Sequence, residues 1–325
     1  MVKPVTFVLS LAVPALAAPT CTWTSWKAVK NMFIFGDSYT QTGFDINSTQ
    51  PHPANPFGNP PFPGYTSSNG PNWIDFLATT YNASFIRAYN LAYGGATVDS
   101  ALVTPYAPTV LSLVDQVQGE FLPRYGSHPA DAPWTGKDSL FAFFIGINDV
   151  GNSWWLNNST LYDAIFARYA GLLDQVYGAG ARNFLFLAVP PVNLAPLTLG
   201  KDDGGYSVQA EGKVILDWNS RLTALTKAFK KSHGDVQVFV HDTYKVFDEV
   251  IKNPKAYPQT SGYKNVTGYC AAYENGTPTW YTKDPSCQYA VNEYLWLNSL
   301  HPTFPMHNAT AASVAQFLGK QKCSK

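Results

Sequence analysis

A serine follows directly on an apolar strand-like segment near the start of the chain. Residues 33–43 read FIFGDSYTQTG, and a buried strand is expected over Asn31–Gly36. Ser38 would then stand on a tight turn at the carboxyl end of this strand, with its hydroxyl accessible and its backbone N–H free to face a developing oxyanion. Gly-Asp-Ser alone is also an ordinary turn or helix cap, so the assignment depends on other segments.

Three later segments supply what a serine nucleophile needs. Residues 90–97 (NLAYGGAT) offer Gly95, whose backbone N–H can approach a substrate closely. Residues 145–149 (IGIND) offer Asn148, whose side-chain amide can donate to an oxyanion. Residues 295–303 (LWLNSLHPT) offer His301 as a general base, and the proline after it holds the backbone extended.

These four segments, in this order, resemble the conserved blocks of the GDSL/SGNH hydrolases, and more narrowly the fungal secreted acetyl esterases of carbohydrate esterase family sixteen. The resemblance implies Ser38 as nucleophile and His301 as base. It implies an oxyanion hole formed by the N–H groups of Ser38 and Gly95 and the side chain of Asn148. It also implies a flavodoxin-like α/β/α sandwich, and no metal or organic cofactor.

One position departs from the family pattern. The family has Asp three residues before the histidine, whereas this chain has Asn298. An amide oxygen can accept the imidazole N–H and fix its tautomer, but it cannot stabilise an imidazolium by charge. Glu293 or a backbone carbonyl are alternative partners for His301. Asp37 and Asp149 are interpreted as residues that set turns.

Strand and helix patterns alternate along the rest of the chain. This βαβα order predicts an α/β fold with a parallel sheet between two helical layers, in which sites form beyond the carboxyl ends of the strands. Further strands are expected at 139–145, 183–189 and 236–240, and helices at 73–81, 110–121, 161–178, 207–231 and 308–320.

Residues 50–73 are rich in Pro, Gly and Asn, which excludes a regular helix or a central strand. A linker is one reading. The many aromatic residues and the position just after the Ser38 turn favour a long ordered loop over an active site.

The chain has four cysteines. An even count behind a secretory leader suggests disulfides, and we favour the pairs Cys270–Cys287 and Cys21–Cys323 over the other connectivities. A zinc site is the alternative, but no Cys-x-x-Cys spacing supports it.

Residues 1–17 have a basic start, an apolar run and an A-x-A pattern, so they are expected to be a signal peptide. Residues 18–325 would form a single secreted domain. Secretion would expose N-x-Ser/Thr sequons to glycosylation. These lie at Asn47, Asn82, Asn157, Asn158, Asn265, Asn275 and Asn308, and because Asn157 and Asn158 overlap we expect one of the two to be used.

Lys plus Arg and Asp plus Glu number 22 each, and charged residues make up only 14% of the chain. This balance argues against nucleic acid or an anionic membrane as partner. We expect a monomeric acetyl esterase that acts on carbohydrate esters. A lipase or phospholipase of the same superfamily is the first alternative, and a non-catalytic carbohydrate-binding or cell-wall protein is the second.

Overall fold

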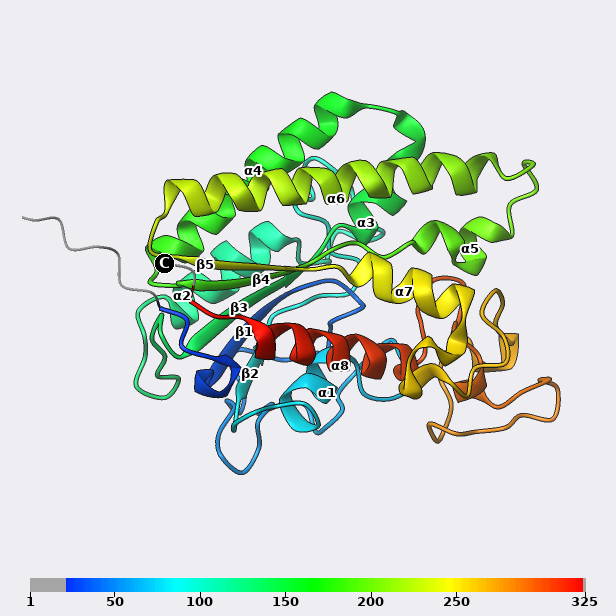
Figure 1. Cartoon of the computed structure of the whole chain (residues 1–325), viewed down its shortest axis with the longest axis horizontal. Helices are drawn as coiled ribbons and strands as arrows, with labels where there is room; N and C mark the ends of the chain where they lie inside the picture. Colours follow the sequence, from blue (N-terminus) through cyan, green and yellow to red (C-terminus); the bar gives the residue numbers. More distant parts are fainter. Residues whose placement is uncertain (1–21, 324–325) are drawn as a thin grey trace, which may run out of the picture.

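The computed structural model describes residues 22–323, and its centre is a five-stranded parallel sheet (Figure 1). The strands are β1 (Asn31–Gly36), β2 (Arg87–Asn90), β3 (Ser139–Phe144), β4 (Asn183–Leu187) and β5 (Gln237–His241), in the spatial order β2-β1-β3-β4-β5. Every residue of β1, β3 and β4 is buried, as expected for strands covered on both faces.

Helices cover both faces of the sheet (Figure 1). α4 (Ser159–Gly178) and α6 (Tyr206–Ser232) pack together on one face, and α1 (Trp73–Thr79) and α8 (Phe304–Lys320) on the other, with α7 (Thr243–Lys252) against α8. The expected three-layer α/β/α architecture is confirmed. The shorter helices are α2 (Leu122–Tyr125), α3 (Ile147–Gly151) and α5 (Pro196–Leu199).

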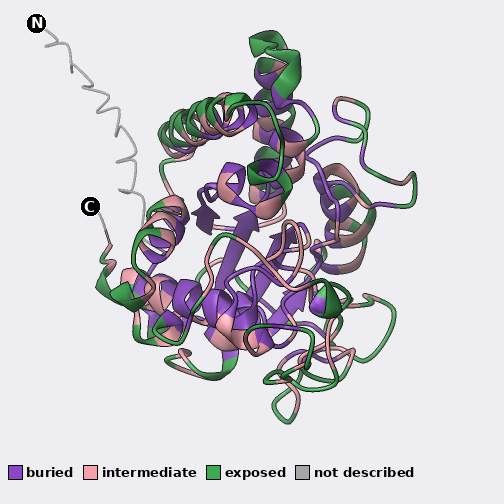
Figure 2. Ribbon diagram, turned by 90° about the vertical axis from the view of Figure 1, so that its right-hand side faces the viewer, coloured by how far each residue is buried: buried purple, intermediate pink, exposed green. Residues whose placement is uncertain are grey.

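Aromatic side chains fill much of the interior between sheet and helices, where buried residues concentrate (Figure 2). Phe33 of β1 stacks between Tyr89 of β2 and Phe141 of β3, with ring centroids 4.8 and 5.1 Å away. Large rings bury much apolar area and lock into few orientations. Their packing therefore helps to hold the three strands side by side. The loops that follow these strands are described below.

Several elements differ from the expectations. The segment expected as a helix over 110–121 is irregular at first and then forms a π-helix, Asp115–Phe121, that leads into α2. Its buried apolar residues recur at helical spacing, but periodicity does not distinguish an α-helix from a wider helix. β2 and the helices α2, α3 and α5 were not predicted, since each has only four or five residues. α7 was also not predicted, although its buried residues Val246, Phe247 and Val250 follow helical spacing.

A disulfide joins Cys270 and Cys287, with Cα atoms 5.8 Å apart, as expected. It closes a segment with little regular structure that packs on its own small cluster of buried side chains. Cys21 and the signal peptide at 1–17 lie outside the described residues, so the Cys21–Cys323 bridge stays a prediction. Within residues 22–323, no helix is long and apolar enough to span a bilayer, and no cluster of acidic, His or Cys side chains could hold a metal.

Gly146, which links β3 to α3, has a backbone φ of +123°. A Cβ there would lie 2.3 Å from the Trp218 ring. Gly146→Ala should therefore lower the free energy of unfolding by about 2–4 kcal/mol, through backbone strain and overpacking. Urea denaturation measures this. Gly171→Ala in α4 is the matched control, because nothing lies near its new Cβ and it should stabilise by about 0.5–1 kcal/mol. Equal stability of both variants would contradict the assigned conformation of Gly146.

Candidate active site

Ser38 lies on the turn that follows β1, and buried amide side chains hold this turn in place. The Gln116 side chain accepts from the Gly36 N–H at 3.0 Å and donates to the Gly36 carbonyl at 2.8 Å. The Asn72 and Asn90 amides both donate to the Thr40 carbonyl, each at 2.7 Å. The turn is therefore anchored on both sides of Ser38 by hydrogen bonds that water does not reach.

The two acidic residues beside the site set turns. One Asp37 oxygen accepts from the Tyr39 N–H at 3.0 Å, and Asp149 accepts from the Val98 N–H at 3.0 and 3.2 Å. Both carboxyl groups are fully buried, and burial raises the pKa of each to about 7. Neither contacts the Ser38 or His301 side chain within the described chain.

His301 reaches Ser38 from the far end of the chain. Its Nε2 lies 2.8 Å from the Ser38 Oγ. The loop that carries it is closed by a hydrogen bond from the Leu297 N–H to the His301 carbonyl, at 2.8 Å. The Tyr39 hydroxyl donates to the Leu300 carbonyl at 2.7 Å, which ties this loop to the serine turn.

Asn298 contacts the other imidazole nitrogen. Its Oδ1 lies 3.1 Å from the His301 Nδ1 and accepts the backbone N–H groups of Leu300 and His301. Its Nδ2 donates to the Glu274 carbonyl at 3.4 Å. These partners fix the amide orientation, so Nδ1 must carry the proton and Nε2 is left to accept from the Ser38 hydroxyl.

The alternative partner Glu293 does not lie at the histidine. Its carboxylate pairs with Lys264 at 2.7 Å and accepts from the Ala290 N–H. No carboxylate therefore offsets the burial of His301, and burial lowers its pKa to about 4.

The expected oxyanion donors come from three separate segments of the chain. In the described part of the chain, the N–H groups of Ser38 and Gly95 donate no hydrogen bond. The Asn148 Nδ2 donates to the Ala96 carbonyl at 3.0 Å, which leaves its second N–H available. Gly95 has a φ of +84° and lies against the Tyr106 ring, so only glycine fits there without strain.

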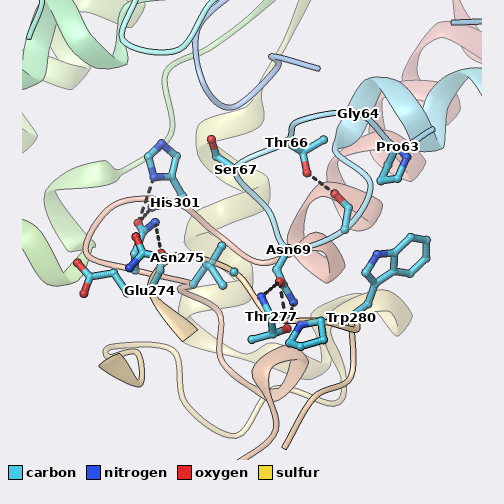
Figure 3. Close-up of a pocket in the computed structure, with 15 residues that line it drawn as sticks. Pro63, Gly64, Thr66, Ser67, Asn69, Glu274, Asn275, Thr277, Trp280 and His301 are labelled. Atoms are coloured by element: carbon cyan, nitrogen blue, oxygen red, sulfur yellow. Dashed lines mark hydrogen bonds between the residues drawn. The ribbon is translucent and has the colours of Figure 1, made fainter. Parts of the chain in front are cut away.

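A cavity of about 650 Å³ opens beside His301 (Figure 3). One wall is the stretch Pro63–Gly70, which belongs to the loop expected to cover an active site. The opposite wall is the stretch 274–280. Asn69 joins the two walls, because its side chain donates to the Thr277 hydroxyl at 2.8 Å and accepts from the Thr277 N–H at 2.7 Å. The lining is mostly polar, with Trp280 as its largest aromatic residue.

Sequence reasoning missed the second wall and the tie through Tyr39. Residues 274–280 lie inside the loop closed by Cys270 and Cys287, so the predicted disulfide was the available signal. Tyr39 gave no such signal, since its partner is a backbone carbonyl 261 residues away in the sequence.

The sequons differ in exposure. Asn47, Asn157, Asn158 and Asn275 are exposed, and Asn275 lines the cavity beside His301. The other three, Asn82, Asn265 and Asn308, are half-buried. Asn308 accepts a hydrogen bond from the Tyr81 hydroxyl at 2.6 Å, which makes it the least suited to carry a glycan.

A family model described as GDSL-like Lipase/Acylhydrolase matches residues 32–311. An acetylesterase of Thermothelomyces thermophilus is 38% identical over 292 residues, which cover 89% of this chain and 88% of that protein. An acetylesterase of Hypocrea jecorina is 24% identical, with 84% of both chains covered. The crystal structure of an acetylxylan esterase from Geobacillus stearothermophilus shares the fold, with a TM-score of 0.50, 14% identity, and 91% of this chain and 97% of that chain covered.

The fold and these matches define the class of the protein as an α/β hydrolytic enzyme with a serine at the end of its first strand. The chain belongs to the GDSL-like lipase/acylhydrolase family, and it is a carboxylic ester hydrolase. The family resemblance inferred from the four sequence segments is thereby confirmed.

The Asn298 contact predicts the pH response of His301. A general base works in its neutral form, so kcat/KM falls as the pH drops below its pKa, here about 4. Asn298→Asp places a negative charge beside Nδ1 and should raise this pKa by about 1–3 units, which moves the acidic limb to higher pH. Asn298→Ala should lower kcat, since nothing then holds the proton on Nδ1.

NMR titration of the His301 imidazole and the pH profile of kcat/KM measure these effects. An unchanged His301 pKa in Asn298→Asp, together with wild-type kcat in Asn298→Ala, would show that Asn298 does not act on the ring. The backbone carbonyl alternative would then become the leading explanation.

Proposed function

We propose that the chain is a secreted esterase that removes acetyl groups from carbohydrates through an acyl-enzyme on Ser38. The observation that carries the mechanism is the line of contacts from Ser38 Oγ to His301 Nε2 at 2.8 Å and from His301 Nδ1 to Asn298 Oδ1 at 3.1 Å. A serine whose proton can pass to an oriented imidazole is an activated nucleophile.

In the proposed reaction, His301 takes the Ser38 proton while Oγ attacks the ester carbonyl. The negative oxygen of the tetrahedral intermediate faces the N–H groups of Ser38 and Gly95 and the free N–H of Asn148. The alcohol leaves with the proton held on Nε2, and the acetyl group remains on Oγ. A water then gives its proton to Nε2, attacks the acyl carbon, and releases acetate as Ser38 regains its proton.

The lining of the cavity beside His301 supports a sugar as the alcohol part of the ester. Ser67, Thr66 and Asn69 face one side and Thr277 the other, and the Trp280 ring offers a flat apolar surface (Figure 3). Hydroxyl and amide groups match sugar hydroxyls, whereas a fatty acyl chain calls for an apolar pocket. Two relatives called acetylesterases support the short acyl group. The Cys270–Cys287 disulfide supports an oxidising compartment and hence secretion.

Ser38→Ala tests the nucleophile. It should reduce kcat/KM for an aryl acetate to less than about a thousandth of wild type, because a triad member typically contributes more than this. The thermal midpoint and circular dichroism should stay close to wild type, since only one oxygen of a half-buried side chain is lost. Ser232→Ala, at the exposed far end of α6, is the control and should keep full activity. Substantial hydrolysis by a folded Ser38→Ala protein would refute the proposed nucleophile.

Asn148→Ala tests the oxyanion donor. It should lower kcat by roughly 10²–10³ with little change in KM, which is the typical effect of losing one such donor. Asn152→Ala, four residues along the chain and exposed, is the matched control and should behave as wild type. Steady-state kinetics on an aryl acetate measure both variants. A wild-type kcat for Asn148→Ala would mean that this side chain only holds the Ala96 carbonyl.

A further inference from the structure

A second cleft lies outside the cavity beside His301. We call it the aromatic cleft; it has a volume of about 270 Å³ and is lined by Trp154, Trp155, Asn157, Tyr206, Gln209 and Lys213, with the α6 residues Ala210 and Val214 at its base. Its volume is close to the lower end of typical small-ligand pockets, about 300 Å³. Trp155 is 56% exposed and Tyr206 is 67% exposed.

The side chains of the aromatic cleft suit a sugar ring. Flat aromatic faces pack against the C–H face of a pyranose, and surrounding polar groups bind its hydroxyls. Within residues 22–323, the side chains of Gln209 and Lys213 make no hydrogen bond or ion pair, and the Trp155 indole N–H has no acceptor. A single exposed aromatic residue needs no explanation, but two on one cleft with unused polar groups indicate a binding site.

Trp154 gives the aromatic cleft one fixed wall. Trp154 is buried, and its ring centroid lies 5.7 Å from that of Trp155 and 6.5 Å from that of Tyr206. The turn before it is fixed by Ser153, whose hydroxyl donates to the Asp149 carbonyl at 2.6 Å and lies 2.7 Å from the Tyr162 hydroxyl. Trp154 is therefore already in place before a ligand binds, which reduces the ordering that binding requires.

The aromatic cleft also adjoins the catalytic residues. Trp154 lines a smaller neighbouring cavity of about 140 Å³, and Asn148 and Leu300 line that same cavity. α3 and the amino end of α6 both lie at the edge of the molecule to which the strands point (Figure 1). A ligand in the aromatic cleft would thus sit on the oxyanion side of Ser38, away from the cavity walls at 63–70 and 274–280.

We propose that the aromatic cleft is a carbohydrate subsite, which holds a sugar ring of the same chain whose acetyl ester lies at Ser38. This inference rests on the proposed carbohydrate function and extends it, because it implies that the enzyme also binds its substrate at a site away from the ester. Small aryl acetates reach Ser38 without touching the aromatic cleft, whereas acetylated oligosaccharides of sufficient length occupy both.

The test compares p-nitrophenyl acetate with acetylated xylo-oligosaccharides of increasing length. Trp155→Ala and Tyr206→Ala should each raise KM for the longer oligosaccharides about 3- to 10-fold with kcat unchanged, as expected for one lost aromatic contact. Both constants for p-nitrophenyl acetate should stay at wild type. Phe85→Ala, an exposed aromatic residue at the opposite end of the sheet, is the matched control and should change neither substrate's KM.

Calorimetry with unacetylated xylo-oligosaccharide and the Ser38→Ala protein tests whether the aromatic cleft binds sugar, without any hydrolysis. Affinity that falls by the same factor when Trp155→Ala is added supports the subsite. Unchanged affinity, or an unchanged KM for the longest oligosaccharide, overturns it. If the wild type hydrolyses p-nitrophenyl acetate but no acetylated sugar, the proposed carbohydrate function fails. The binding measurement still shows whether the aromatic cleft binds a sugar.

The Asn157 sequon requires a separate control, because a glycan attached there could fill the aromatic cleft. Ser159→Ala removes this sequon but leaves the Asn157 side chain in place. Under the proposal, Ser159→Ala binds xylo-oligosaccharide as well as the wild type does. If binding appears only in Ser159→Ala, the aromatic cleft is occupied by the protein's own glycan and the proposal is wrong.

Discussion

The hydrogen bond from the Tyr39 hydroxyl to the Leu300 carbonyl joins two segments that lie 261 residues apart in the sequence. Ser38 precedes one partner and His301 follows the other, so this bond helps to hold close together the two side chains that are proposed to react. Its donor is buried and fixed between aromatic neighbours, which gives it the strength of a hydrogen bond in a low-dielectric interior. The rest of the site is arranged around Ser38 and His301.

The parallel sheet explains why segments so distant in sequence can meet. β1 and β3 are neighbours in full register, with Gly36 opposite Phe144, so the turns that carry Ser38 and Asn148 leave the same edge side by side. The loops that shape substrate access then come from elsewhere in the chain. One wall of the cavity is held by proline and asparagine turns, and the other lies in the loop that the Cys270–Cys287 disulfide closes. The turns that carry Ser38 and Asn148 are thus positioned by the sheet, whereas the cavity walls are positioned by other segments.

The sequence predicted the sheet core and the residues at its edge, because buried strands and the turns after them have strong local patterns. Helices longer than about ten residues were also recognised by their periodicity, except for α7. The hydrogen bonds from Tyr39 to the Leu300 carbonyl and from Asn298 to the Glu274 carbonyl could not be foreseen, since both join separate segments and both use a backbone oxygen. The π-helix at Asp115–Phe121 was missed because apolar periodicity does not distinguish it from an α-helix, and its Gln116 side chain bonds to Gly36, far away in the sequence. Local sequence pattern therefore points to the residues that are proposed to react, and tertiary contacts decide how their side chains are oriented.

The neutral amide at Asn298 has a consequence for the conditions in which the enzyme can work. A carboxylate in this place would stabilise the imidazolium during turnover, but it would also keep the imidazole protonated in mildly acidic solution. The amide gives up that charge stabilisation and leaves His301 unprotonated across a wider range of acidity. Under the proposed mechanism, charge stabilisation of the imidazolium is exchanged for a neutral base over a wider pH range, which would suit the secreted location proposed above.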